Sequence, residues 1–212
     1  MNLNRRMFHG LIAAAALLGA VALAPLSASA ADKEQAALAL VKSIGDEAVD
    51  ILSNDALTDA QKQDHFEKFL DSSFDMERIG RFVLGQHWRT ATEEQRREFL
   101  VVFRDYMVSS YADKIGNYSG ENLEFREAVS LNDKETLVHS LIVRPNGPPV
   151  KLDWRVRQGD TDAKIVDIIV EGISMAQTQR SDFSSAISQP GVGVEGLINK
   201  LKAQINSASA AN

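Results

Sequence analysis

Hydrophobic residues recur every three or four positions through the first half of the chain, beginning after residue 30. This spacing places them on one face of an amphipathic helix. Prolines are absent between Pro25 and Pro145, so none interrupts a helix in that interval. Three helices are predicted here, over residues 37–53, from Thr58 onward, and over roughly residues 75–88. Their apolar faces are Leu40, Val41, Ile44, Ala48, Ile51 and Leu52; Phe66, Phe69 and Leu70; and Ile79, Phe82 and Val83.

The best-defined helix is predicted after Thr92. Thr92 and Gln95 have the spacing of a capping box, and Glu93 and Glu94 suit the positive end of the helix dipole. Gly116 supplies an end signal. The inner face of this helix comprises Phe99, Val102, Phe103 and Tyr106.

After Gly120 the hydrophobic period changes from near four to two, which is typical of strands with one buried face. Four such segments, at 122–130, 135–144, 150–158 and 163–172, are separated by short connections rich in turn residues. Connections this short join antiparallel neighbours. The sequence therefore predicts an α+β fold with a four-stranded antiparallel sheet packed by helices, followed by two short helices broken at Pro190-Gly191.

The segment 150–158 alternates without a fault. Val150, Leu152, Trp154 and Val156 lie on one face of this strand, and Lys151, Asp153, Arg155 and Arg157 lie on the other. Such an apolar face either packs against helices as ordinary core or lines a cavity that holds an apolar molecule. Periodicity alone leaves both interpretations open.

The first thirty residues have the pattern of a signal peptide. Arg5 and Arg6 precede an unbroken apolar run, Leu11 to Ala24, that is too short to span a bilayer. Ala28-Ser29-Ala30 fits an Ala-x-Ala cleavage site. The arginine pair fits either a twin-arginine signal or a general secretory signal. We expect residues 1–30 to be removed and residues 31–212 to form a single exported domain.

Charge and cysteine content exclude several classes of function. The chain holds 23 basic and 29 acidic residues, and removal of Arg5 and Arg6 leaves 21 − 29 = −8 for residues 31–212. A chain this acidic is a poor partner for nucleic acid. There is no cysteine, so disulfides, thiolate metal sites and a lipid-modified cysteine anchor are all excluded.

Candidate chemistry is sparse. His65, His87 and His139 have no metal-ligand spacing, so no metal site and no cofactor are predicted. Ser174 lies in a Gly-x-Ser sequence resembling the nucleophile elbow of hydrolases, with His139 and Asp167 as conceivable partners. That elbow joins a strand to a helix in a parallel sheet and ends in a glycine that this chain lacks. An esterase is therefore a minor alternative, and no catalytic residue is assigned.

Two stretches resemble a known family. The segment "FVLGQHWRTATEEQRREFLVVFRDYMVSSYADKI" (82–115), and "RPNGPPVKLDWRV" (144–156) followed by "VDIIVEGISMAQTQRSDF" (166–183), are similar to the MlaC or toluene-tolerance family of periplasmic phospholipid-binding proteins. The "LGQ" and "EGISM" segments are the most specific, and a weaker likeness extends over nearly all of residues 31–212.

The resemblance implies a soluble carrier that shuttles phospholipid between an outer-membrane lipoprotein-porin complex and an inner-membrane ABC transporter with an MCE-domain protein, and so maintains outer-membrane lipid asymmetry. It also implies a twisted sheet with acyl chains held between sheet and helices. Relatives associated with hopanoid genes share these motifs, so a hopanoid is an alternative cargo. A third alternative is an exported adaptor that binds only proteins.

With this resemblance, the apolar face of 150–158 is interpreted as one wall of a lipid cavity. We expect a cavity of roughly 1,000 Å³, at the upper end of small-molecule pockets. Strand residues are expected to face three helix residues across it. The predicted lipid-binding residues are Val138, Ile142, Val150, Leu152, Trp154, Val156, Val166 and Ile168 on the strands, and Phe82, Phe103 and Tyr106 on the helices.

Overall fold

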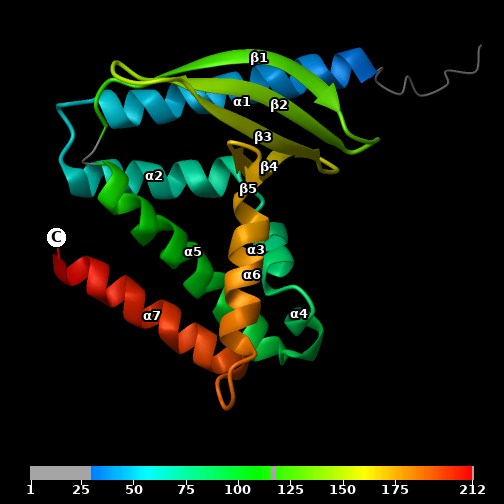
Figure 1. Ribbon diagram of the computed structural model, residues 1–212, viewed down its shortest axis with the longest axis vertical. Helices are drawn as coiled ribbons and strands as arrows, with labels where there is room; N and C mark the ends of the chain where they lie inside the picture. The colour runs from blue at the N-terminus through cyan, green and yellow to red at the C-terminus, as the bar shows by residue number, and fades with distance from the viewer. Residues whose placement is uncertain (1–29, 116–117, 212) are drawn as a thin grey trace, which may run out of the picture.

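The computed structural model describes residues 30–115 and 118–211, arranged as a sheet with helices packed against it (Figure 1). The expected signal peptide lies outside the described residues except for Ala30, and Gly116 also lies outside them. The helices are α1 (Ala30–Ser53), α2 (Asp59–Ser73), α3 (Met76–Leu84), α4 (His87–Thr90), α5 (Glu93–Ile115), α6 (Met175–Ile187) and α7 (Gly193–Ala211).

Both predicted capping boxes are present. At the start of α2, Gln61 N donates to Thr58 Oγ1 at 3.3 Å, and Thr58 N donates to Gln61 Oε1 at 2.9 Å. At the start of α5, the reciprocal bonds between Thr92 and Gln95 are both 3.1 Å long. These bonds satisfy backbone N–H groups that have no partner inside the helix.

The helix predicted over 75–88 is two helices in the structure. Asp75 caps α3 by accepting Arg78 N at 3.0 Å, and Gly85 ends it with a φ of 57°. Glycine adopts this left-handed backbone without the steric penalty of a side chain. The chain therefore turns at Gly85 before the single turn of α4.

The strands form an antiparallel meander in the order β1-β2-β3-β4-β5. They are β1 (Asn122–Ser130), β2 (Glu135–Val143), β3 (Val150–Gln158), β4 (Ala163–Val170) and β5 (Ile173–Ser174). The α+β fold and antiparallel sheet are confirmed, but the predicted count of four strands is wrong by one. The fifth arises because Glu171 (φ 50°) and Gly172 (φ 81°) reverse the chain, so that Ser174 pairs with Ile169.

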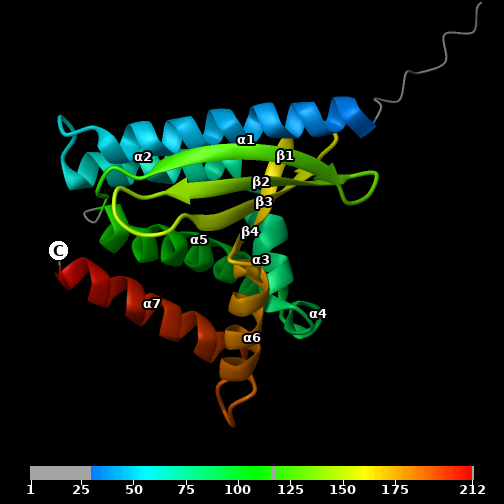
Figure 2. The same cartoon turned by 45° about the horizontal axis from the view of Figure 1, so that its top comes forward.

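The buried hydrophobic residues form two clusters. The sheet cluster joins the apolar face of the sheet to α1 and α2, and the helical cluster joins α3, α5, α6 and α7. Figures 1 and 2 show the same arrangement, in which α1 lies against the sheet and α2 lies next to α1. Helices α5, α6 and α7 lie on the opposite side of α2 from α1. The chain therefore has two apolar interiors, which meet along α2, α3 and β4.

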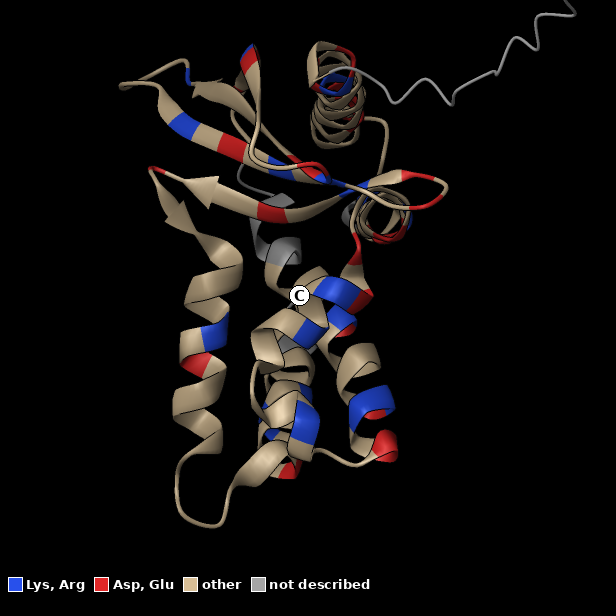
Figure 3. Cartoon of the chain, turned by 90° about the vertical axis from the view of Figure 1, so that its right-hand side faces the viewer, with Lys and Arg blue, Asp and Glu red and all other residues tan. Residues whose placement is uncertain are grey.

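Charged residues of both signs are interspersed over the strands and helices (Figure 3). Several form cross-element pairs, such as Arg157 with Glu135 at 2.5 Å and Lys202 with Glu98 at 2.6 Å. Within residues 30–115 and 118–211, no helix has the length and apolar character needed to cross a membrane.

Candidate functional site

The apolar face of the sheet is continuous across four strands. Val138 on β2 is paired with Trp154 on β3, which is paired in turn with Ile168 on β4. Paired residues in a sheet project from the same face. We call this surface the dry face; it consists of Leu123, Phe125 and Ala128 on β1, Val138 and Ile142 on β2, Val150, Leu152, Trp154 and Val156 on β3, and Ile165, Ile168 and Val170 on β4.

The polar groups of Trp154 and Ser140, at the centre of the dry face, are bonded within the sheet. The indole Nε1 of Trp154 donates to Ser140 Oγ at 2.9 Å, and Ser140 Oγ donates to the carbonyl oxygen of Leu152 at 2.5 Å. Trp154 and Ser140 are buried, with 6% and 3% of their surface exposed. Because this donor and this hydroxyl are satisfied within the sheet, the centre of the dry face presents hydrocarbon to whatever packs against it.

Helices α1 and α2 cover the dry face. Ala37, Val41 and Ile44 of α1 and Phe69 of α2 are buried in the sheet cluster. A Cβ atom at Gly45 would lie 2.6 Å from Phe125 Cζ and 2.8 Å from Leu123 Cδ1, so this glycine permits α1 to approach β1 closely. The sequence predicts the apolar faces of these two helices but does not indicate that they pack on the sheet.

Strand β4 departs from strict alternation. Its register with β3 shifts between Arg155 and Val156, since Arg155 pairs with Asp167 whereas Val156 pairs with Ile165. The shift is a β-bulge, which inserts one extra residue into β4. Ile165 is fully buried in the sheet cluster, and Val166, expected on the dry face, is only partly buried. The alternation predicted for Val166 and Ile168 is therefore wrong at Val166.

The three helix residues predicted to face the strands belong elsewhere. Phe103 is buried in the helical cluster, stacked on Phe99 with ring centroids 5.6 Å apart, and Tyr106 packs against that cluster. Phe82 is 40% exposed. The remaining predicted strand residues lie on the dry face. The structure thus brings together the strand part of the predicted set on the dry face, whereas Phe103 and Tyr106 belong to the helical cluster.

An arginine joins the two clusters. Arg104 on α5 donates two bonds of 2.8 Å to the carboxylate of Asp71 on α2, and it lies 3.5 Å from Glu67 Oε2. These hydrogen bonds hold the pKa of the Asp71 carboxyl below its usual value and raise the pKa of the Arg104 guanidinium above its usual range. Lys164 on β4 also donates to the backbone carbonyls of Asp71 and Ser72. Helix α2 is therefore tied to both α5 and the sheet.

Cavities lie beside the helices in the described part of the chain. A groove of about 730 Å³ runs between α1 and α2 and is lined by Lys42, Asp46, Asp50, Leu57 and His65, among others. A cavity of about 360 Å³ lies among α5, α6 and α7 and includes Tyr106 and Phe183. A third, of about 50 Å³, reaches Val156 beneath the start of α1. These three do not lie between the dry face and Phe82 or Phe103, and residues of α1 and α2 pack on the dry face.

The residues considered for an esterase do not form a nucleophile–base pair. Ser174 Oγ donates to Asp167 Oδ2 at 2.6 Å and accepts from Gln177 N at 3.0 Å, which makes Ser174 the N-cap of α6. His139 instead lies 2.9 Å from Asp153 Oδ1 on the neighbouring strand. A triad needs the histidine between the serine and the carboxylate. In the part of the chain that the structure describes, three or more His, Asp or Glu side chains are nowhere arranged to hold a metal ion.

Two comparisons identify relatives of the chain. The intermembrane phospholipid transport system binding protein MlaC of Haemophilus influenzae is 25% identical over 131 residues, which is 60% of this chain and 60% of that protein. A solved structure of a phospholipid-binding protein from Ralstonia solanacearum, in complex with a phospholipid, matches with a TM-score of 0.71 and 25% identity; it covers 82% of this chain and 98% of that one.

The family comparison covers most of the chain. The model of the family described as "MlaC protein" matches residues 42–203, a span that begins within α1 and ends within α7. It therefore includes the sheet, the second half of α1 and the first eleven of the 19 residues of α7. The chain belongs to the MlaC family.

Proposed function

We propose that this protein is a phospholipid carrier that holds acyl chains against the dry face. The observation that carries the proposal is the dry face itself, whose central polar groups on Trp154 and Ser140 are bonded within the sheet and whose other side chains are hydrocarbon. The Haemophilus relative is named for phospholipid transport, and the Ralstonia structure holds a phospholipid. No reaction chemistry is needed for this role, and none is assigned.

The free-energy cost of exposing acyl chains to water sets how much of a bound lipid the carrier must cover. Two acyl chains contain on the order of thirty methylenes. Exposing one methylene to water costs about 0.8 kcal/mol, so exposing both chains costs roughly 25 kcal/mol. The protein must therefore cover nearly all of both chains. Moving a lipid from a bilayer into such a site is close to neutral, because each environment shelters the chains equally. The headgroup stays at the solvent edge, since burying its charge unpaired is prohibitive.

Helix α1 is the wall that we expect to separate from the sheet. It packs on β1, β2 and α2, and two of its hydrogen bonds to the sheet side run from Ser130 N to Glu34 Oε1 at 2.9 Å and from Lys33 Nζ to Asp133 O at 3.2 Å. Helix α2 is held more firmly, through the Arg104–Asp71 pair and Lys164. Separation of α1 opens the dry face while α2 keeps the two clusters joined.

The proposal also includes the cellular location of the carrier and the membrane complexes that it contacts. We place the carrier in the periplasm after cleavage of a signal peptide. There it exchanges phospholipid between an outer-membrane lipoprotein-porin complex and an inner-membrane ABC transporter with an MCE-domain protein, which maintains outer-membrane lipid asymmetry. This assignment rests on membership of the MlaC family and on the name of the Haemophilus relative.

The test is the lipid that accompanies the protein. Protein purified without detergent should yield intact diacyl phospholipid by mass spectrometry. Leu152→Glu places a carboxylate on the dry face and should abolish lipid retention, whereas Lys151→Glu, one residue away on the solvent face, should retain it. Val156→Phe, which adds only apolar volume, serves as a second variant if Leu152→Glu unfolds by circular dichroism. Equal lipid content in all variants contradicts the site.

The other candidate functions give different results in the same experiment. A hopanoid in the extract replaces phospholipid as the cargo. Free fatty acid released by the wild type but not by Ser174→Ala indicates an esterase. An empty protein that still binds membrane complexes indicates an adaptor.

A further inference from the structure

Arginines without carboxylate partners gather at the end of the molecule formed by α3, α4 and the start of α5. Between Arg78 and Arg89 the chain has three arginines and no acidic residue. Residues 76–97 hold five arginines and three glutamates, a net charge of 5 − 3 = +2, in a chain whose net charge is −6. Within the described ranges, four arginines at this end form no ion pair: Arg81, Arg89, Arg96 and Arg180.

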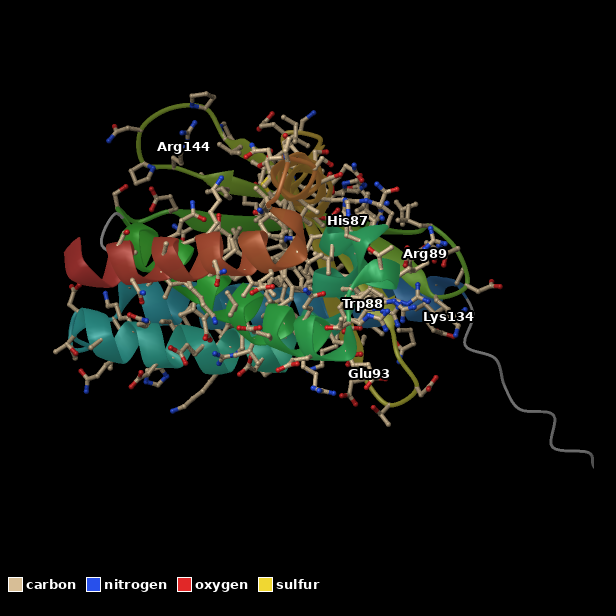
Figure 4. The ribbon with its side chains drawn as sticks, turned by 90° about the horizontal axis from the view of Figure 1, so that it is seen from below. His87, Trp88, Arg89, Glu93, Lys134 and Arg144 are labelled. Atoms are coloured by element: carbon tan, nitrogen blue, oxygen red, sulfur yellow. The ribbon has the colours of Figure 1, made fainter. Side chains whose placement is uncertain are left out.

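Two of these arginines hold Trp88. The guanidinium carbons of Arg81 and Arg96 lie 5.9 and 5.5 Å from the centre of its ring. Arg96 also donates to the carbonyl oxygens of Trp88 and Arg89 at 2.7 and 3.2 Å, which fixes the short helix α4. Figure 4 shows Trp88 and Arg89 together on α4, on the underside of the molecule. Two cations at one ring, without a carboxylate between them, leave net positive charge at a rigid aromatic side chain.

Arg180 extends the cluster from α6. Its guanidinium carbon lies 5.0 Å from the centre of the Phe82 ring, which is 40% exposed. A Cβ atom at Gly85 would come within 2.9 Å of Arg180 Nε, so the glycine leaves the space that this side chain occupies. We call Arg81, Arg89, Arg96 and Arg180, with Phe82 and Trp88, the arginine patch.

Other charged groups nearby do not neutralise the patch. Glu93 pairs with Arg97 at 3.8 Å in a highly exposed pair, and neither Glu77 nor Glu94 forms an ion pair within the described ranges. Elsewhere in the described ranges, Arg104, Arg126 and Arg157 have acidic partners at 2.8, 2.8 and 2.5 Å, whereas Arg144 and Arg155 form no ion pair but lie apart from one another, on the β2–β3 connection and on β3. Unpaired arginine beside an exposed aromatic ring has the composition of an interface hot spot, since Trp and Arg dominate such sites.

We infer that the arginine patch is a docking surface for a protein partner whose own surface is rich in carboxylates. Guanidinium groups bind carboxylates in two-pronged geometry. Arg81, Arg96 and Arg180 are already held by stacking, so less side-chain freedom is lost on binding. An extended polyanion is a poorer fit, because the acidic remainder of the chain repels it. The patch lies at the opposite end of the molecule from α1 (Figures 1 and 2), so docking there leaves α1 free to move.

The choice of partner for the test rests on the proposed function. The probe is the purified periplasmic domain of the MCE-domain protein, immobilised for biolayer interferometry. The double variant Arg81→Glu with Arg89→Glu should weaken binding by roughly tenfold or more, with most of the change in the dissociation rate. The matched control is Arg126→Glu with Lys134→Glu on the sheet side, which makes the same change of −4 in net charge and should bind almost as the wild type does.

Three results overturn the inference. Unchanged binding of the Arg81/Arg89 variant shows that the patch is not the interface. An equal loss in the Arg126/Lys134 control shows an effect of total charge. Wild type that binds phosphatidylglycerol vesicles through the patch, but binds the MCE domain independently of it, assigns the patch to a membrane surface.

The experiment distinguishes failure of this inference from failure of the proposed carrier function. Co-purified phospholipid is measured on the same preparations, so a lipid-loaded protein that does not bind the MCE domain refutes the inference alone. A protein without lipid contradicts the carrier itself.

Discussion

Removal of the Ser140 hydroxyl tests whether the dry face is apolar because its polar atoms are bonded internally. In Ser140→Ala, Trp154 Nε1 loses its acceptor and the carbonyl oxygen of Leu152 loses a donor, in a region where both side chains are buried. A stranded buried donor costs about 1–3 kcal/mol, and a lost hydrogen bond about 0.5–1.5 kcal/mol. We expect the free energy of unfolding to fall by about 2 kcal/mol, which lowers Tm by roughly 4–8 °C for a chain of this size.

A double-mutant cycle separates this effect from simple loss of volume. Trp154→Phe removes the indole donor, so adding Ser140→Ala to it strands no donor and removes only the bond to the Leu152 carbonyl oxygen. The cost of Ser140→Ala should then drop below about 1 kcal/mol, a coupling well above the roughly 0.3–0.5 kcal/mol expected of independent sites. Urea denaturation measures all four proteins. Ser140→Ala should still co-purify with lipid, because the hydrocarbon surface is unchanged. Equal costs of Ser140→Ala in both backgrounds would falsify the reasoning.

Three further predictions concern α1, α2 and α6. Gly45→Val should destabilise the protein by roughly 1–3 kcal/mol, because the introduced valine collides with Phe125 and Leu123. The control is Ala39→Val, on the exposed side of α1. An equal loss of stability in both variants contradicts close packing of α1 on β1. Asp71→Asn should lower stability at neutral pH by about 1 kcal/mol or less, since Asp71 is half exposed. The lowered folded-state pKa of Asp71 stabilises the protein above the ordinary aspartate pKa, so the difference from wild type should shrink as the pH falls below about 4, and a difference that persists in acid excludes this cause. Ser174→Ala should cost about 1 kcal/mol through loss of the α6 cap without altering bound lipid, and loss of lipid contradicts a purely structural serine.

The sequence determined the parts of the fold that depend on local patterns. Alternation along residues 150–158 placed Leu152, Trp154 and Val156 on one face, because successive side chains of a strand point to opposite sides. Short turn-rich connections required antiparallel neighbours, and the spacing of Thr58 and Gln61 marked the start of a helix. Each of these features acts within a few residues of the chain, so it can be read without knowing what lies opposite.

Only the tertiary structure decided which apolar faces meet. Helices α1 and α3 both have an apolar face. The pattern of neither face indicates that α1 packs on the sheet whereas α3 belongs to the helical cluster. The bulge that buries Ile165 in place of Val166 depends on the register between β3 and β4. Likewise, Arg81 and Arg96 lie fifteen positions apart and meet at Trp88 only because the chain turns at Gly85. Hydrophobic burial is non-directional, so periodicity indicates that a face is buried, and the packing of the whole chain selects its partner.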